Sequence, residues 1–166
     1  AASNRIVGAE ALLRWKNCEL CKVPPNVFIP LAENLGIIKE FGDWVLENAC
    51  KEAASWKDFT DDRLTVSVNV SPQQFRTDSL LKSVDRAIAK SGLAYHHLEL
   101  EITETLLLQD SEVPLSILEQ LHQRGIILSL DDFGTGYSSL AYLKRLPITK
   151  LKIDQSFVRK AGEVSF

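Results

Sequence analysis

Five short runs rich in β-branched residues and leucine alternate with helical patterns along this 166-residue chain, and this alternation constrains its fold most. The runs cover residues 6–14, 64–70, 97–103, 126–132 and 148–154. Strands that alternate with helices form right-handed βαβ units, and these units build a parallel sheet. The first gap, between residues 15 and 63, is long enough for two helices. We therefore predict an α/β fold in one domain, without an internal linker.

Apolar residues recur at helical spacing between the predicted strands. Helices are expected at 38–56, 80–88, 115–121 and 138–146, and Gly92 and Gly125 end the second and third of them. Trp44 and Trp56 fall on the apolar stripe of the first of these helices and are expected in the core. Cys18 and Cys21 have CxxC spacing but are expected to be two incidental thiols in a loop.

Each predicted strand has one polar face, which a parallel strand covered by helices on both sides would not have. In the second strand Val66, Val68 and Val70 alternate with Ser67 and Asn69. The polar faces are expected to point inward, with the chemistry at the C-terminal ends of the strands, as in barrel enzymes. An open doubly wound sheet would gather such residues at only one switch point. Five contributing strands therefore favour a TIM-like (β/α) barrel with parallel strands.

Ligand-type residues stand near the C-terminal ends of all five predicted strands. They are Glu10, Asn69, Glu101, Asp131, Asp132 and Lys152. Four carboxylates at one mouth would repel one another, and their oxygens, with that of an amide, suit Mg²⁺ or Mn²⁺. Two such ions stabilise an in-line phosphoryl displacement, and a lysine beside them adds positive charge. Any one of these residues could be a cap or an ion-pair partner, but the joint pattern indicates metal-dependent phosphodiester hydrolysis.

A second enzyme class shares some of these features. A metabolic barrel enzyme could use Mg²⁺ to stabilise an enolate, with Lys152 as the base. That reading does not account for Arg14 close to Glu10, or for the Asp-Phe-Gly-Thr-Gly sequence that begins at Asp132.

Charge and composition exclude several other classes. The formal net charge of −3 offers no basic face for DNA or RNA. No apolar run approaches the roughly 20 residues of a membrane span, so this part of the chain is expected to make no membrane contact. Three cysteines argue against a secreted disulfide framework. We expect a cytoplasmic protein, or the cytoplasmic part of a larger membrane-anchored one.

Six ordered motifs resemble those of the EAL domain family, the bacterial cyclic-di-GMP phosphodiesterases. They lie at residues 10–15 (EALLRW), 28–33 (FIPLAE), 67–72 (SVNVSP), 98–104 (LELEITE), 131–140 (DDFGTGYSSL) and 151–154 (LKID). The resemblance runs from Asn4 to about Arg159. It implies hydrolysis of cyclic di-GMP to linear pGpG in bacterial signalling.

The resemblance also implies a role for each motif residue. Glu10, Asn69, Glu101 and Asp131 would hold one metal ion, and Asp131 and Asp132 a second. Lys152 would contact the water nucleophile, and Leu12 and Arg14 would meet the substrate. Glu104 would hold the 132–140 loop, which is expected to form a homodimer contact.

The match to the family covers part of the barrel. The family has a further strand before Asn4, and strands beyond Phe166 that supply another glutamate and a glutamine. We therefore expect residues 1–166 to form a partial EAL-type phosphodiesterase domain, without the barrel's first and C-terminal strands. Either the sequence omits segments of a larger protein, with flanking sensory or regulatory domains, or a partner completes the fold. A catalytically inactive cyclic-di-GMP receptor of the same fold is the alternative function.

Overall fold

The computed structural model describes residues 6–19, 21–58, 64–76, 79–103, 106, 112–133, 143 and 146–154. Five strands form one sheet in the order β1-β4-β5-β6-β7. They are β1 (Gly8–Ala11), β4 (Thr65–Val70), β5 (Leu98–Thr103), β6 (Ile127–Phe133) and β7 (Lys150–Ile153). All four neighbouring pairs are parallel. The predicted parallel α/β sheet is therefore confirmed.

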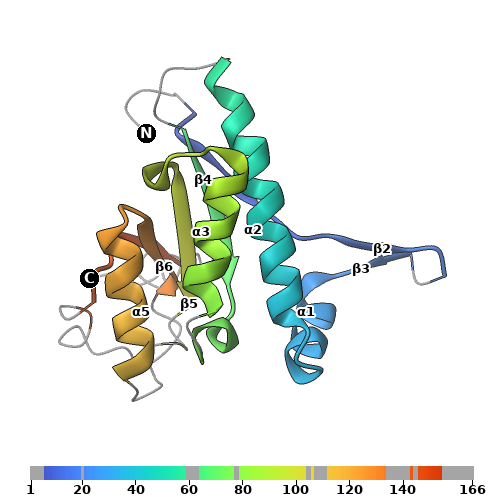
Figure 1. Ribbon diagram of the computed structural model, residues 1–166. Helices are drawn as coiled ribbons and strands as arrows, with labels where there is room; N and C mark the ends of the chain where they lie inside the picture. The colour runs from blue at the N-terminus through green and yellow to red at the C-terminus, as the bar shows by residue number, and fades with distance from the viewer. Residues whose placement is uncertain are drawn as a thin grey trace, which may run out of the picture.

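Helices cover one face of this sheet. The connections hold α1 (Pro25–Asn34), α2 (Ile38–Ala54), α3 (Ser79–Ser91) and α5 (Glu112–Gln123), with short 3₁₀ helices η1 (Ser55–Asp58), η2 (Pro72–Arg76) and η3 (Tyr95–His97). In Figure 1, α5, α3 and α2 stand side by side in front of the strands. Gly92 and Gly125 follow α3 and α5 with φ of +71° and +90°, the left-handed conformation with which glycine ends a helix.

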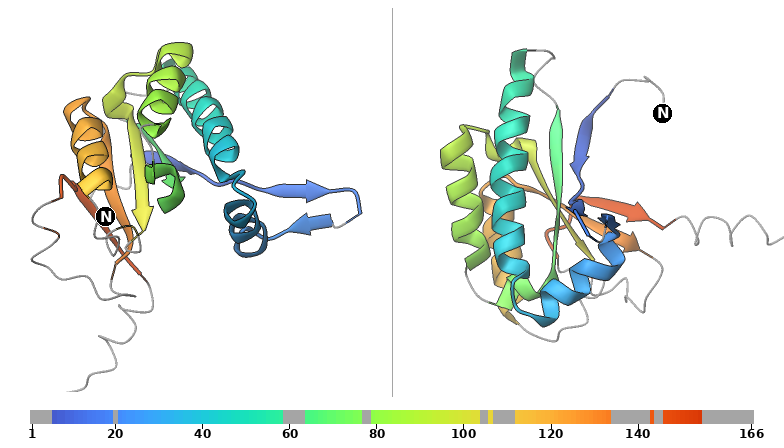
Figure 2. Two further views of the ribbon diagram at one scale, coloured as in Figure 1. Left: turned by 60° about the horizontal axis from the view of Figure 1, so that its bottom comes forward. Right: turned by 90° about the vertical axis from the view of Figure 1, so that its right-hand side faces the viewer.

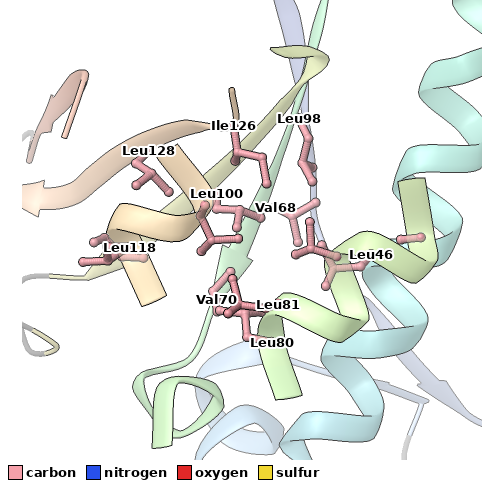
Figure 3. Close-up of a cluster of buried hydrophobic side chains, with 14 of the residues drawn as sticks. Leu46, Val68, Val70, Leu80, Leu81, Leu98, Leu100, Leu118, Ile126 and Leu128 are labelled. Carbon is pink, nitrogen blue, oxygen red and sulfur yellow. The ribbon is translucent and has the colours of Figure 1, made fainter. Parts of the chain in front are cut away.

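The core lies between the sheet and these helices. Val66, Val68 and Val70 of β4 alternate with more polar residues and face the helices. Figure 3 shows Val68, Leu100 and Leu128 from three neighbouring strands meeting Leu46, Leu80 and Leu118 from α2, α3 and α5. Leu98, Leu100, Leu128 and Leu130 are 0% exposed. The period of two along β4, β5 and β6 thus sends the apolar residues to the helices and the polar ones to the other face. In β7 the apolar Leu151 and Ile153 are 49% and 56% exposed.

The second face of the sheet is concave and polar. Within the described ranges no helix covers it, as the right-hand view of Figure 2 shows. It carries alternate residues of each strand, among them Glu10, Ser67, Asn69, Glu101 and Lys152. The described part of the chain is therefore a parallel half-barrel whose inner surface is polar.

Two local predictions were wrong. Cys18 lies in a turn after β2 (Trp15–Asn17), as predicted, but Cys21 is the first residue of β3 (Cys21–Val23), which pairs with β2 as an antiparallel hairpin. This hairpin projects away from the sheet (Figure 1). Trp44 is 60% exposed, so it is not a core residue, whereas Trp56 packs partly buried against the core.

Two further predictions concern other parts of the chain. Most of the helix expected at 138–146 lies outside the described residues. None of the described helices is both long and apolar enough to cross a membrane.

Candidate active site

Glu10 and Asn69 lie together at the C-terminal end of the half-barrel. Glu10 is on β1 and pairs in register with Ser67 of β4, two residues before Asn69. The side-chain amide of Asn69 donates a hydrogen bond of 2.7 Å to Oε1 of Glu10. Both residues are exposed at the mouth.

Lys152 stands among carboxylates from three other strands. Its Nζ lies 2.6 Å from Oε2 of Glu101 on β5, 3.8 Å from Oδ2 of Asp131 on β6 and 4.0 Å from Oε2 of Glu10 on β1. The parallel register explains this meeting, because Asn69 pairs with Glu101 and Thr103 with Asp131. The structure thus brings five of the predicted site residues together, namely Glu10, Asn69, Glu101, Asp131 and Lys152.

The electrostatics of this group keep Lys152 charged. Burial alone would lower the pKa of Lys152, but the hydrogen bond to Glu101 and the nearby Asp131 and Glu10 raise it above its usual value of 10.5. Burial raises the pKa of Glu101, and Lys152 offsets this only in part because Glu10 and Asp131 repel a further negative charge. The site therefore pairs the Lys152 ammonium with a carboxylate whose pKa burial raises and Lys152 lowers.

Asp132 is placed by an irregularity in β6. The pairing of β6 with β7 shifts between Leu130 and Phe133, and Asp132 has a φ of +55°. Burial raises the pKa of Asp132, and the charges of Asp131 and Asp154 raise it further. The two adjacent aspartates therefore share one electrostatic environment, although a regular strand would point them to opposite faces.

Asp154 is a member of this environment that the sequence analysis did not single out. It lies two residues after Lys152, directly beyond the end of β7. The alternation that placed Lys152 on the polar face also put Asp154 there. That spacing is the signal that could have identified it.

Leu12 and Arg14 lie at the edge of a neighbouring groove of about 450 Å³. The groove is also lined by Glu33, Asn69 and Ser71. Because Asn69 is bonded to Glu10, the groove lies beside the cluster of carboxylates around Lys152. Leu12 is 52% exposed, and the Arg14 guanidinium donates to the backbone oxygen of Leu13 at 3.0 Å. The predicted substrate-binding residues thus lie next to, but outside, the group around Lys152.

Glu104, predicted to hold the 132–140 loop, lies outside the described residues, as does most of that loop.

The donor set fits a hard divalent cation. Glu10, Asn69, Glu101 and Asp131 supply carboxylate and amide oxygens from four adjacent strands, which is the ligand chemistry that Mg²⁺ and Mn²⁺ prefer. As the described side chains stand, they include no group of three or more His, Cys, Asp or Glu residues arranged to hold a metal ion. In this arrangement the Lys152 ammonium balances the charge of the carboxylates.

Comparison with known proteins agrees with this picture. The family model for the EAL domain matches residues 1–164. The chain is 44% identical over 99% of its length to the bifunctional diguanylate cyclase/cyclic di-GMP phosphodiesterase MucR of Pseudomonas aeruginosa, but spans 24% of that protein. It is 43% identical over 95% of its length to the cyclic di-GMP phosphodiesterase NbdA of the same organism, of which it spans 20%.

A solved structure shares the fold. The PaMucR phosphodiesterase in complex with c-di-GMP superimposes with a TM-score of 0.90 at 43% identity, over 98% of this chain and 66% of that chain. Sequence, fold and the residues at the strand ends agree, and the chain belongs to the EAL domain family.

Proposed function

We propose that this site hydrolyses cyclic di-GMP to linear pGpG with the help of divalent metal ions. The observation that carries the proposal is the meeting of Lys152 with Glu10, Glu101 and Asp131 within 4.0 Å, beside Asn69. Each residue comes from a different strand of one parallel sheet, at its C-terminal end. The names of the relatives MucR and NbdA support the same substrate and reaction.

The chain's carboxylates would hold the metal ions. Glu10, Asn69, Glu101 and Asp131 would hold one Mg²⁺ or Mn²⁺ ion, and Asp131 and Asp132 would hold a second. Bound ions would supply Lewis-acid stabilisation of the attacking and leaving oxygens of an in-line displacement. A bound cation would favour the ionised forms of Glu101 and Asp132, whose pKa values burial raises.

Lys152 would act on the reacting phosphate and the attacking water. Its ammonium remains protonated at neutral pH and is fixed by Glu101, so it can donate a hydrogen bond without reorganising. Positioned donors of this kind stabilise charge that develops in the transition state. Leu12 and Arg14, in the groove beside Asn69, would orient the rest of the dinucleotide.

The remaining parts of the proposal concern the protein beyond the described residues. We infer that residues 1–166 are part of a catalytic EAL domain in the cytoplasm and that Glu104 holds the 132–140 loop in its active arrangement. That loop would contact a second copy in a homodimer. Flanking sensory or regulatory domains are supported by the length of MucR, of which the chain spans 24%.

The proposal is tested by incubating the protein with cyclic di-GMP and either Mg²⁺, Mn²⁺ or a chelator, and separating the products by anion-exchange chromatography. Linear pGpG that forms with metal and not with chelator is the expected result. Tight binding of cyclic di-GMP without any product would instead identify a receptor of the same fold.

A further inference from the structure

The corner that follows Asn69 is built around Ser71. β4 ends at Val70, and η2 begins two residues later at Pro72. Asn69 donates to Glu10 across the strand pair at 2.7 Å. The Asn69 side chain therefore lies two residues before this corner, on a strand that pairs with β5 up to Val70.

Ser71 has three local hydrogen bonds and one that reaches a distant part of the chain. Its N–H donates to Oε1 of Gln74 at 3.1 Å, its carbonyl accepts from the Gln74 N–H at 3.0 Å, and its hydroxyl accepts from the Gln73 N–H at 3.3 Å. The same hydroxyl donates to Oε1 of Glu33, on α1, at 2.6 Å. Hydrogen bonds to a carboxylate are about twice as strong as neutral ones. The Glu33 carboxylate is thus the anchor of the corner: its hydrogen bond with the Ser71 hydroxyl ties the corner to α1.

The opposite side of the corner packs against α2. Gln74 is 5% exposed, and a Cβ at position 42 would overlap its side-chain amide, so Gly42 allows this close approach. Glu33 and Gln74 therefore hold Ser71 between two helices. Glu33 also lines the groove that contains Arg14 and Asn69, so the anchor forms part of the groove's wall.

We infer that Glu33 is a positioning residue: through Ser71 it fixes the end of β4 and with it the Asn69 amide against Glu10. This inference rests on the proposed function in so far as Asn69 serves a metal-dependent reaction. Groups that orient metal ligands from behind change metal affinity or activity by about 10- to 100-fold when they are removed. Glu33 would act on Asn69 indirectly, through its hydrogen bond to Ser71, which lies two residues after Asn69.

The kinetic test compares Glu33→Ala, Glu33→Gln and Ser71→Ala, with Glu52→Ala as an exposed control on α2. Glu33→Ala is expected to lower kcat and to raise the Mn²⁺ concentration needed for half-maximal rate, by about 10-fold or more. Glu33→Gln keeps a neutral hydrogen-bond acceptor. Its kcat and its Mn²⁺ requirement are therefore expected to lie between those of Glu33→Ala and those of the unchanged chain. Ser71→Ala removes the bond to Glu33 and also the bond from the Gln73 N–H, so the Glu33→Ala/Ser71→Ala double variant should be no worse than Ser71→Ala alone.

A second readout does not depend on activity. The side-chain amide resonances of Asn69, assigned by their loss in Asn69→Asp, should shift in Glu33→Ala and less in Glu33→Gln. Unchanged resonances and an unchanged metal requirement in a folded Glu33→Ala overturn the inference. Should Glu33→Ala not fold by circular dichroism, a Glu33→Gln that matches the unchanged chain in both readouts overturns it. Shifted Asn69 resonances in a protein that never forms pGpG would support the positioning role and reject only the proposed function.

Discussion

Lys152 and Glu101 form the tightest charged contact at the mouth of the half-barrel. The two charged groups lie 2.6 Å apart, and the Glu101 side chain is only 1% exposed. An inner pair, Lys150 and Glu99, lies two residues earlier on the same two strands. Its charged groups are 2.8 Å apart, and the Glu99 side chain is also 1% exposed. Only the outer pair has Asp131 and Glu10 within 4.0 Å of its lysine. The inner pair therefore provides a control for the outer one.

Lys152→Met should lower kcat by about 100- to 1,000-fold with little change in KM, because the ammonium is expected to act in the transition state. Steady-state hydrolysis of cyclic di-GMP measures both constants. Lys150→Met also leaves a buried glutamate without its lysine but should retain kcat. Equal loss of kcat in both variants, or an effect on KM alone, would show that Lys152 has no role of its own in the chemical step.

The same variant should make stability more sensitive to pH. The folded-state pKa of Glu101 is already raised above 4.5, chiefly by burial, and loss of Lys152 should raise it further. A carboxyl whose folded pKa lies above its unfolded value costs stability as pH rises through that interval. In thermal unfolding, the Tm of Lys152→Met should therefore lie further below that of the unchanged chain at pH 8 than at pH 5. A Tm difference that is equal at both pH values would contradict the assigned role of Glu101.

Leu100→Ala should destabilise the chain by about 2–5 kcal/mol, because Leu100 is 0% exposed at the centre of the sheet and its loss leaves a cavity. Chemical denaturation measures the change. Leu35→Ala, at a position that is 64% exposed, should change stability by less than about 0.5 kcal/mol. Similar effects of the two substitutions would mean that the core does not lie between the sheet and the helices.

Asp43→Asn should cost about 1 kcal/mol at pH 7, because Asp43 on α2 accepts a hydrogen bond of 2.8 Å from Arg86 on α3. Partial burial raises the pKa of Asp43, but bonds from Ser83 and Arg86 outweigh burial and hold the pKa below 3.8. For a lowered carboxyl pKa, the stabilisation is present above the unfolded value and is lost as pH falls through the folded one. The difference in unfolding free energy between Asp43→Asn and the unchanged chain should therefore shrink below about pH 4. A difference that stays constant down to pH 3 would show that the charge of Asp43 contributes nothing.

The sequence predicts the sheet and most of the site because strands have a period of two. Once Val66, Val68 and Val70 face the helices, Asn69 must face the other way, and parallel register then sets Glu101 beside it. Periodicity alone therefore places Glu10, Asn69, Glu101, Asp131 and Lys152 on one surface. It contains no information on which charged groups touch, so the central position of Lys152 emerges only from the structure.

The features that were missed lack such a repeat. Strands β2 and β3 have three residues each, too few for a pattern to be recognised. Trp44 lies between Phe41 and Val45 in sequence and so close to the apolar stripe of α2, yet it turns outward and is 60% exposed. The left-handed backbone of Asp132 comes from a strand irregularity that no residue type at that position predicts.

Metal-dependent hydrolysis of cyclic di-GMP is the reaction that we propose for the carboxylates around Lys152. Its most direct test follows pGpG formation over time by the unchanged chain and by Glu101→Gln, across a series of Mn²⁺ concentrations. We predict product from the unchanged chain only with metal, and none from a folded Glu101→Gln at any concentration on the same timescale. Equal rates from the two proteins would contradict a role of Glu101 in this hydrolysis.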